Sequence, residues 1–562
     1  MSSKQNRDRP DIRPAATLVL IRDSTNGPEV LLQQRSPDAA FMPGSYVFPG
    51  GAVEASDRSG PILQRVVGLT DDEASARLGV VHGGLSYWVA AARECFEEAG
   101  ILIACDEGGR PMPRANVAGY DGERHALNSK QLDFADFLVR HGLFLHALEF
   151  AYFDHWITGP IAPRRFDTRF FIALAPAGQS GSSDDSEAVR TVWLRPSDAI
   201  DLMGRQQMVI ATATESVLRE FSRYETAADG LAYARGKKHI EANRAAVAQG
   251  SVGQRVFRRG DAAYAEIHWC DRDETTRTTY DLLPGIPKRL DEFVTRVIAP
   301  NPGIMTGPGT NTYLVGKDDI VVIDPGPGID SHVAAILAAA GRPIRWIACT
   351  HTHRDHSPAA RALQAATGAR MLGIRAPEGQ NQDESFIPDW EVAHDEMLQI
   401  AGVRIRALRT PGHASNHVCL LLENTGMLFA GDHVMQGSTV VINPPDGNMT
   451  AYLASLQALL AREIAVIAPG HGYLIGSPHR ELQRLMEHRR KREAKVVDAV
   501  ADHAGATLPE LLPIVYSDTP APLHAAASRS LLAHLEKLIA EGRVAGSLGR
   551  YESIGKKQKD WT

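Results

Sequence analysis

The feature that most constrains this chain is a run of metal-binding residue types at residues 350–356. Three histidines and one aspartate fall within this run. His351 and His353 stand at alternating positions, so both can point to one side of an extended segment. Asp355 and His356 follow at once, where a loop can turn them toward the same spot. Imidazole and carboxylate are the ligands that zinc prefers, so the run predicts part of a metal site.

Three downstream residues are suitable partners for this run. His413, Asp432 and His471 each follow an apolar stretch that is typical of a strand, and each lies on a turn that contains glycine. Ligands on loops after separate strands can meet at one end of a sheet. The spacing therefore predicts one metal centre built from four segments of the chain.

This arrangement resembles the metallo-β-lactamase superfamily, whose ligand positions are all filled here. The resemblance implies an αββα sandwich and two Zn²⁺ ions, with Asp355 counted as catalytic as well as metal-binding. Two bound metals lower the pKa of a shared water and so supply hydroxide near neutral pH. The implied ligands form two groups and a bridge: His351, His353 and His413; Asp355, His356 and His471; and Asp432 between them.

Composition excludes several classes of protein. The net charge of −7 over 562 residues gives no global basic field, so nucleic-acid binding would need a local patch. No apolar run approaches the length of a membrane span, and the N-terminus lacks the apolar core of a signal peptide. The five cysteines are scattered, which favours a reducing, cytoplasmic setting.

A chain of 562 residues is too long for one core. Strands alternate with helices at 319–323, 333–340, 344–349 and 359–367, which indicates an α/β layered module around the histidines. The predicted class is an α/β multidomain protein. The predicted domains are 10–235 with an insertion at about 58–88, a connector at 236–290, a metal-binding domain at 291–478, and a small C-terminal domain at 479–562.

A second cluster of metal-binding residue types lies near the N-terminus. Residues 90–99 are compatible with a helix, and Gly100 is well placed to end it. Glu94, Glu97 and Glu98 stand at i, i+3 and i+4, so three carboxylates crowd one face of that helix. A hard cation such as Mg²⁺ would relieve their repulsion, whereas the alternative is a solvated acidic face.

Together with Gly51, the segment 93–101 resembles the Nudix box, which implies an α/β/α sandwich and hydrolysis of a nucleoside diphosphate linked to another group. The resemblance implies that Glu94, Glu97 and Glu98 bind Mg²⁺ or Mn²⁺ with the Gly51 carbonyl. Glu97 or Glu98 would orient the attacking water, and Arg93 is counted with them as catalytic.

Two departures from the Nudix pattern concern Asp57. This residue stands where the family usually has glutamate, and residues 58–92, 35 in number, separate it from Arg93 where seven are usual. The excess would be an insertion before the helix. It makes a contact between Asp57 and Arg93 an open question.

A weaker pattern concerns the nucleotide-type, small-molecule substrate. Residues 31–36, Gly44 and residues 48–51 are similar to the signature of Nudix coenzyme A diphosphatases, with Arg35 as a substrate-binding residue. Ala40 replaces an arginine of many such enzymes, and residues 41–43 resemble the branch active on acyl-CoA. Glu187 is an additional candidate ligand or base. Alternatively, Arg35 only caps a strand.

The C-terminal segment holds helical runs at 481–503, 508–516 and 523–541, followed by a small β wing. With residues 301–313, it resembles the beta-lactamase-like protein 2 family, in which a winged-helix domain follows the lactamase fold and animal members cleave single-stranded RNA. The basic run 488–493 could contact phosphates. The alternative is a helix face that is solvated or braces the metal domain.

Three functions therefore compete at this point. The chain is a Nudix diphosphatase joined to a zinc hydrolase, or a zinc nuclease with a nucleotide-sensing Nudix half, or a Nudix enzyme joined to a thioester hydrolase. A ligand-binding regulator without catalysis would need a broken Nudix metal site, and the three glutamates are intact. The sequence predicts no oligomeric state.

Overall fold

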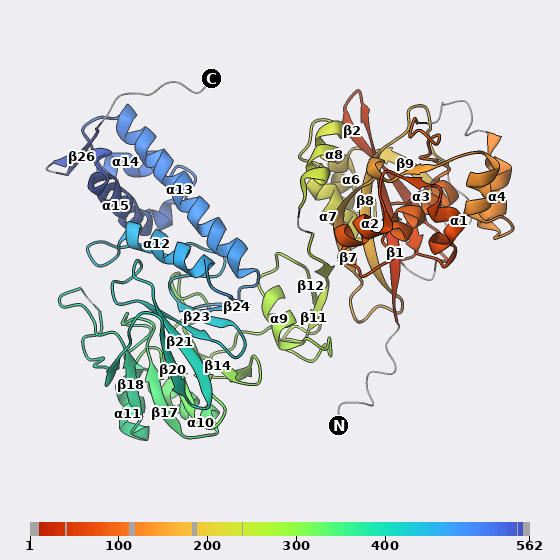
Figure 1. The fold of residues 1–562 in the computed structure, drawn as a ribbon. Helices are drawn as coiled ribbons and strands as arrows, with labels where there is room; N and C mark the ends of the chain where they lie inside the picture. Colours follow the sequence, from red (N-terminus) through yellow and green to blue (C-terminus); the bar gives the residue numbers. More distant parts are fainter. Residues whose placement is uncertain are drawn as a thin grey trace. The chain divides into compact units, whose positions relative to one another are not determined.

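A computed structural model describes residues 11–39, 42–111, 119–182, 188–238, 240–380, 382–547 and 549–554 (Figure 1). The chain divides into two compact units, Met1–Val247 and Ala248–Thr562. In the described residues, no helix combines the length and the apolar composition that crossing a membrane would require.

The first unit is built on an eight-stranded mixed sheet. Its first two strands, β1 and β2, form an antiparallel hairpin with Ser24 of β1 opposite Gly27 of β2. The strands β1 and β8 run parallel, and β4 pairs with β1. The strands are β1 (Ile12–Ser24), β2 (Gly27–Arg35), β3 (Tyr46–Val47), β4 (Gly50–Ala52), β7 (Ala151–Ile157), β8 (Arg165–Leu174), β9 (Ala188–Leu194) and β10 (Asn243–Arg244).

Helices cover both faces of this sheet. Leu18 and Leu20 of β1 pack with α3 (Leu85–Ala99), whereas Val19 and Ile21 pack with helices on the other face. Alternate residues of a strand point to opposite faces, so one strand supplies two cores. Further helices of this unit are α4 (Asp121–Asn128), α5 (Phe134–Arg140), α6 (Pro196–Gly204), α7 (Thr212–Phe221) and α8 (Ala227–Gly236).

The stretch expected as an insertion folds into small elements before α3. It contains α1 (Gly60–Leu63), β5 (Val66–Val67), which pairs with β6 (Leu145–His146), and α2 (Asp71–Leu78). Thr70 and Glu73 form a capping box at the start of α2. The helix α3 starts at Leu85, earlier than the predicted residue 90, and ends at Gly100 with φ +66° as expected.

The second unit contains two facing sheets. A seven-stranded and a five-stranded sheet share one core, in which Ile323 and Leu398 come from different sheets. The first sheet is β13 (Lys288–Arg289), β14 (Val294–Ile298), β15 (Asn311–Val315), β16 (Ile320–Ile323), β17 (Ile344–Ala348), β18 (Arg370–Gly373) and β19 (Trp390–Glu391). The second is β20 (Glu396–Ile400), β21 (Val403–Arg409), β22 (Val418–Leu422), β23 (Met427–Gly431) and β24 (Val466–Pro469).

Helices cover the outer face of each sheet. The helices α10 (Asp330–Ala340) and α11 (Ala359–Thr367) pack on the first sheet, with Ile336 and Leu363 in a shared core. The helices α12 (Met449–Leu460) and α13 (Pro478–Asp502) pack on the second. The layers therefore run helix, sheet, sheet, helix.

A segment of the predicted connector docks into this second unit. The connector region contains β11 (Ala246–Ala248), β12 (Arg255–Phe257) and α9 (Tyr264–Cys270). Glu266 of α9 is fully buried and accepts hydrogen bonds from Arg296 at 2.7 and 2.8 Å and from Lys288 at 2.6 Å. The backbone N–H of Leu474 also donates to Glu266, at 3.0 Å. Burial opposes its ionisation, but Arg296 and Lys288 outweigh burial and lower the pKa of Glu266 to about 2.

The C-terminal part adds helices and a small three-stranded sheet to the second unit. Val496 of α13 and Leu535 of α15 share its core. The three predicted helical runs and the predicted wing are confirmed within a few residues. Besides α13, the elements are β25 (Ala506–Thr507), α14 (Leu508–Val515), α15 (His524–Ala540), β26 (Val544–Ser547) and β27 (Arg550–Ser553).

Candidate metal centres

Four loops of the second unit bring the predicted histidines and aspartates together. The run that begins at His351 follows β17, and His413, Asp432 and His471 follow β21, β23 and β24. Gly470 permits this approach, since a Cβ there would lie 2.6 Å from Asp432 Oδ1. The sequence prediction that separate strand ends supply one site is consistent with this geometry.

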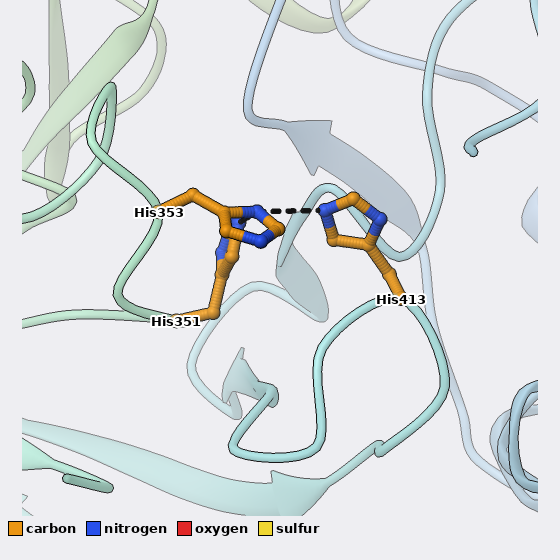
Figure 2. Close-up of side chains that lie close together, drawn as sticks. All are labelled: His351, His353 and His413. Atoms are coloured by element: carbon orange, nitrogen blue, oxygen red, sulfur yellow. Dashed lines mark hydrogen bonds between the residues drawn. The ribbon is translucent and has the colours of Figure 1, made fainter. Parts of the chain in front are cut away.

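The first group consists of His351, His353 and His413 (Figure 2). The Nδ1 atom of His353 lies 2.9 Å from Nε2 of His351 and 3.0 Å from Nε2 of His413. Burial and the neighbouring imidazoles lower the pKa of His353 to about 4, and they lower the pKa of His351 well below its ordinary value. The rings of His351 and His353 are therefore neutral near pH 7, which is the form that binds metal ions.

The second group consists of Asp355, His356, Asp432 and His471. His471 Nε2 lies 3.3 Å from Asp355 Oδ2 and 3.4 Å from Asp432 Oδ1. Burial opposes a charge on His471, but the two carboxylates outweigh burial and raise its pKa to about 9. Burial likewise opposes ionisation of Asp432, yet His471 and His356 hold the pKa of this carboxyl well below its usual range.

Asp432 faces both groups. Its Oδ1 atom lies 3.5 Å from Nε2 of His356, and its Oδ2 atom lies 3.8 Å from Nε2 of His413. One carboxylate therefore directs one oxygen toward each set of ligand atoms.

Several atoms of these groups are buried without a partner. Nε2 of His356, Nε2 of His471 and Oδ1 of Asp432 have no hydrogen-bond partner among the residues that the structure describes. A buried polar group left unsatisfied costs about 1–3 kcal/mol. A divalent cation would satisfy all three atoms, and imidazole with carboxylate is a donor set suited to zinc. The residues present therefore fit a bound metal.

Backbone and acidic groups orient the outer sides of these rings. Asp324, which directly follows β16, accepts hydrogen bonds from Nδ1 of His356 at 3.0 Å and from the Thr350 backbone N–H at 2.7 Å. The carbonyl of Val441 accepts from His413 Nδ1 at 2.8 Å, and that of Gly309 accepts from His471 Nδ1 at 3.2 Å. In His356, His413 and His471, such contacts at Nδ1 leave Nε2 facing the other candidate metal ligands.

Asp324 directly follows the strand predicted at 319–323, and its residue type alone did not predict a role for it. An acidic residue at the carboxyl end of a strand next to the His351 segment was the available signal. Val441 and Gly309 act through their backbone carbonyls, so their residue types do not predict these roles.

The N-terminal candidate centre lies along α3 of the first unit. Arg93 makes a bidentate contact with Asp57, with Nε and Nη2 each 2.9 Å from a carboxylate oxygen. The same guanidinium contacts Glu94 at 2.9 Å and Glu97 at 3.0 Å. The contact that the long insertion left open is therefore present, and it gathers the carboxylates around Arg93.

Two glycines of β4, Gly50 and Gly51, lie against the glutamates of this centre. Glu98 accepts a hydrogen bond from the Gly50 backbone N–H at 3.0 Å, and a Cβ at Gly51 would lie 2.4 Å from Glu94 Oε1. Burial raises the pKa of Glu97 even though Arg93 and Lys130 oppose this shift. The oxygens of Glu94, Glu97 and Glu98 are not gathered as tightly as the two groups of the second unit.

The remaining predicted residues concern the substrate. Arg35 is half-buried at the end of β2, and its backbone N–H donates to the Ser45 carbonyl at 3.0 Å. Its role in substrate binding stays a prediction. Ala40, Phe41 and Glu187 lie outside the described residues.

Comparison with known proteins matches this architecture. A sequence model of the metallo-β-lactamase superfamily matches residues 305–471. The chain is 30% identical over 277 residues to the beta-lactamase-like protein 2 homolog of Drosophila melanogaster, covering 47% of this chain and 93% of that protein. The chain belongs to the metallo-β-lactamase superfamily.

Two further sequence models match this member of the superfamily. A NUDIX domain model matches residues 11–126, and a model of the beta-lactamase associated winged helix domain matches residues 507–549. The predicted fold class, with Nudix, metallo-β-lactamase and winged-helix domains in this order, is confirmed.

Two other known proteins are similar to parts of this chain. This chain is 31% identical over 245 residues to the thioesterase pkgB of Emericella nidulans, and the match covers 43% of this chain and 68% of that protein. It is 27% identical to the NUDIX hydrolase from Alicyclobacillus acidocaldarius, with a TM-score of 0.35, covering 40% of this chain and 96% of that one. The family matches and the thioesterase relative make this chain a hydrolase, as predicted.

Proposed function

We propose that the chain is a bifunctional metal-dependent hydrolase, with a dinuclear zinc centre in the second unit and a Nudix diphosphatase in the first. His351, His353 and His413 would hold one Zn²⁺, and Asp355, His356 and His471 the other. The two-sided placement of Asp432 carries this proposal, since one oxygen faces each group. Bound zinc would supply an activated water and stabilise negative charge on the attacked atom.

The protein's own residues set up this chemistry. Asp324 and the carbonyls of Val441 and Gly309 hold the rings with Nε2 inward. Asp355, which is catalytic in this proposal, lies 3.3 Å from His471 and so carries negative charge beside the ligand atoms.

For the zinc half, a thioester is the favoured substrate. A relative named as a thioesterase supports this assignment, as does the similarity of residues 31–51 to coenzyme A diphosphatases. The alternative is cleavage of single-stranded RNA. Two residues of the basic run, Arg489 and Arg492, are 2% and 8% exposed and donate to backbone carbonyls inside the protein. These two side chains are unavailable to phosphates, which disfavours the alternative.

For the Nudix half, the proposed substrate is CoA or acyl-CoA. Glu94, Glu97 and Glu98 would bind Mg²⁺ or Mn²⁺ with the Gly51 carbonyl, since hard cations prefer oxygen ligands. Arg93 gathers the carboxylates, and Glu97 or Glu98 would orient the attacking water. The metal would neutralise charge on the diphosphate, and the remaining work is placement of the water.

The proposed domain limits are 10–235, 236–290, 291–478 and 479–562. Arg93 to Gly100 and the metal-binding histidines then fall in different domains. The five cysteines are all unpaired, which supports a reducing, cytoplasmic setting as part of the proposal.

A single substrate tests both halves. Purified full-length protein is incubated with an acyl-CoA and Mg²⁺, and the products are separated by mass. Free thiol reports thioester hydrolysis, and the two phosphate-bearing fragments report diphosphate cleavage. We expect both sets of products, each lost separately in His413→Ala and Glu98→Ala. Cleavage of single-stranded RNA with intact acyl-CoA would overturn the substrate assignment.

A further inference from the structure

A short segment, Val440 to Ile442, connects the first group of candidate metal ligands with the C-terminal helices. We call these three residues the 440–442 strap. Val440 is 3% exposed and Ile442 is fully buried. Each of the three residues makes a backbone hydrogen bond to a different partner, and those partners alternate between the C-terminal part and the metal groups.

The two ends of the strap are held by the C-terminal part. Arg489 on α13 donates through Nη2 to the carbonyl of Val440. Ser530 on α15 accepts a hydrogen bond at 3.4 Å from the backbone N–H of Ile442. Both side chains are buried, so neither contact competes with solvent.

Apolar packing reinforces these two contacts. Val440 and Ile442 belong to one core with Leu485 of α13 and Ala533 of α15. The guanidinium of Arg489 also lies over the ring of Tyr452 on α12, 5.4 Å from its centroid. The strap is therefore fixed to α13 and α15 by charge, by hydrogen bonding and by burial.

The middle of the strap holds His413. The Val441 carbonyl can only accept, so Nδ1 of His413 donates the hydrogen bond at 2.8 Å. The lone pair of this ring is then on Nε2, the atom that lies 3.0 Å from His353 Nδ1. A shift of the strap would move the acceptor that sets both the tautomer and the orientation of this ring.

We infer that Arg489 and Ser530 are positioning residues for the first metal group, acting through the 440–442 strap on His413. The winged-helix part is then a working component of the metal centre. The contacts of the strap involve His413 and no residue of the second group among the described residues. Loss of Arg489 or Ser530 should therefore weaken metal binding at the group of His351, His353 and His413. This inference rests on the proposed metal binding.

The test measures metal affinity at each site in the full chain. Wild type is compared with Ser530→Ala, Arg489→Met and Arg489→Lys, and with Arg490→Met as a control on the same helix. Arg490 is exposed and one residue from Arg489, so it matches the charge change without touching the strap. Zinc per chain is measured against graded chelator, and Co²⁺ binding is followed by its visible absorption.

We expect two metals per chain in wild type and in Arg490→Met. In Arg489→Met and Ser530→Ala, affinity at one site should fall by about 10–100-fold, as for loss of other groups that orient a ligand, while the second site keeps its affinity. Arg489→Lys keeps a donor near Val440 and should recover part of the loss. A role confined to general stability would not separate the two sites.

The outcomes distinguish this inference from the proposed function. Fewer than two metals in wild type would overturn the dinuclear proposal itself. Two metals in wild type with unchanged affinities in Ser530→Ala and Arg489→Met would overturn the inference alone, as would equal weakening of both sites. Ser530→Ala removes a single oxygen and so decides the matter if Arg489→Met does not fold.

Discussion

The two candidate centres of this chain are assembled in different ways. The N-terminal centre draws its three glutamates from one helix, α3, and already contains a cation of the protein, Arg93, which also contacts Asp57. The C-terminal centre draws ligand atoms from four loops and leaves three buried polar atoms with no hydrogen-bond partner in the described part of the chain. Arg93 therefore already offsets part of the negative charge of the first centre, whereas the unpartnered atoms of the second centre fit an added cation.

The largest expected effect is separation of the two activities by single substitutions. Glu98→Ala should lower diphosphatase activity by about 10²–10⁴-fold, the usual contribution of a group that activates the attacking water. His413→Ala removes a proposed zinc ligand and should abolish most of the zinc-centre activity. Each variant should retain the other activity. Rates with acyl-CoA measured for both product sets check this. A common loss in either variant would show that the two centres are not independent.

The next effect concerns stability of the N-terminal unit. Arg93→Met leaves Asp57 and Glu97 buried without their cation, and breaking such a pair typically costs about 3–5 kcal/mol. Urea unfolding followed by tryptophan fluorescence gives the free energy. Arg77→Met on α2 is the control, since Arg77 is exposed and should change stability by less than about 0.5 kcal/mol. Equal effects of the two variants would contradict the central role of Arg93.

Metal removal should destabilise the second unit more than the first. A ligand at about 1,000 times its Kd contributes about 4 kcal/mol to the folded state. Calorimetry with and without chelator should show a loss of this size for the second unit and a smaller loss for the first, because Arg93 already offsets part of the charge of the first centre. An equal shift of both unfolding transitions would contradict the prediction that the second unit depends more on bound metal than the first.

A smaller effect concerns pH and the buried ion pairs of the second unit. The pKa of Glu266 is held at about 2, below its ordinary value of 4.5, so its stabilising contribution is present above pH 4.5 and disappears as pH falls toward 2. The difference corresponds to about 3 kcal/mol. Unfolding free energies between pH 5 and 3 should decline less steeply in Glu266→Gln. An unchanged slope would show that other groups carry the acid sensitivity.

The sequence predicted the loops of the C-terminal centre because the three downstream ligands, His413, Asp432 and His471, each stand on a turn that contains glycine after an apolar strand. Gly470 illustrates the physical reason, since any side chain there would collide with Asp432. Helix limits were also accessible, as α11 and the end of α3 show.

Other contacts were beyond sequence reasoning. The bidentate contact of Arg93 with Asp57 spans the insertion, and only the fold brings the two residues together. The basic run in α13 suggested phosphate binding, but helix packing turns Arg489 and Arg492 inward. The carbonyls of Val441 and Gly309 act through the backbone, which no residue type encodes. The domain limits and the roles of the ligands stay predictions.

The Asp57–Arg93 contact has a consequence for how such enzymes diversify. Lengthening the intervening chain from seven residues to 35 costs about 1.4 kcal/mol in closure entropy, while one hydrogen bond between charged groups contributes about 1.5–3 kcal/mol. Two such hydrogen bonds hold Asp57 and Arg93 together at the ends of the insertion. Residues can therefore be added between them without moving the carboxylates of α3. The insertion is therefore a position where new substrate-recognition elements can evolve while the glutamates of α3 keep their arrangement.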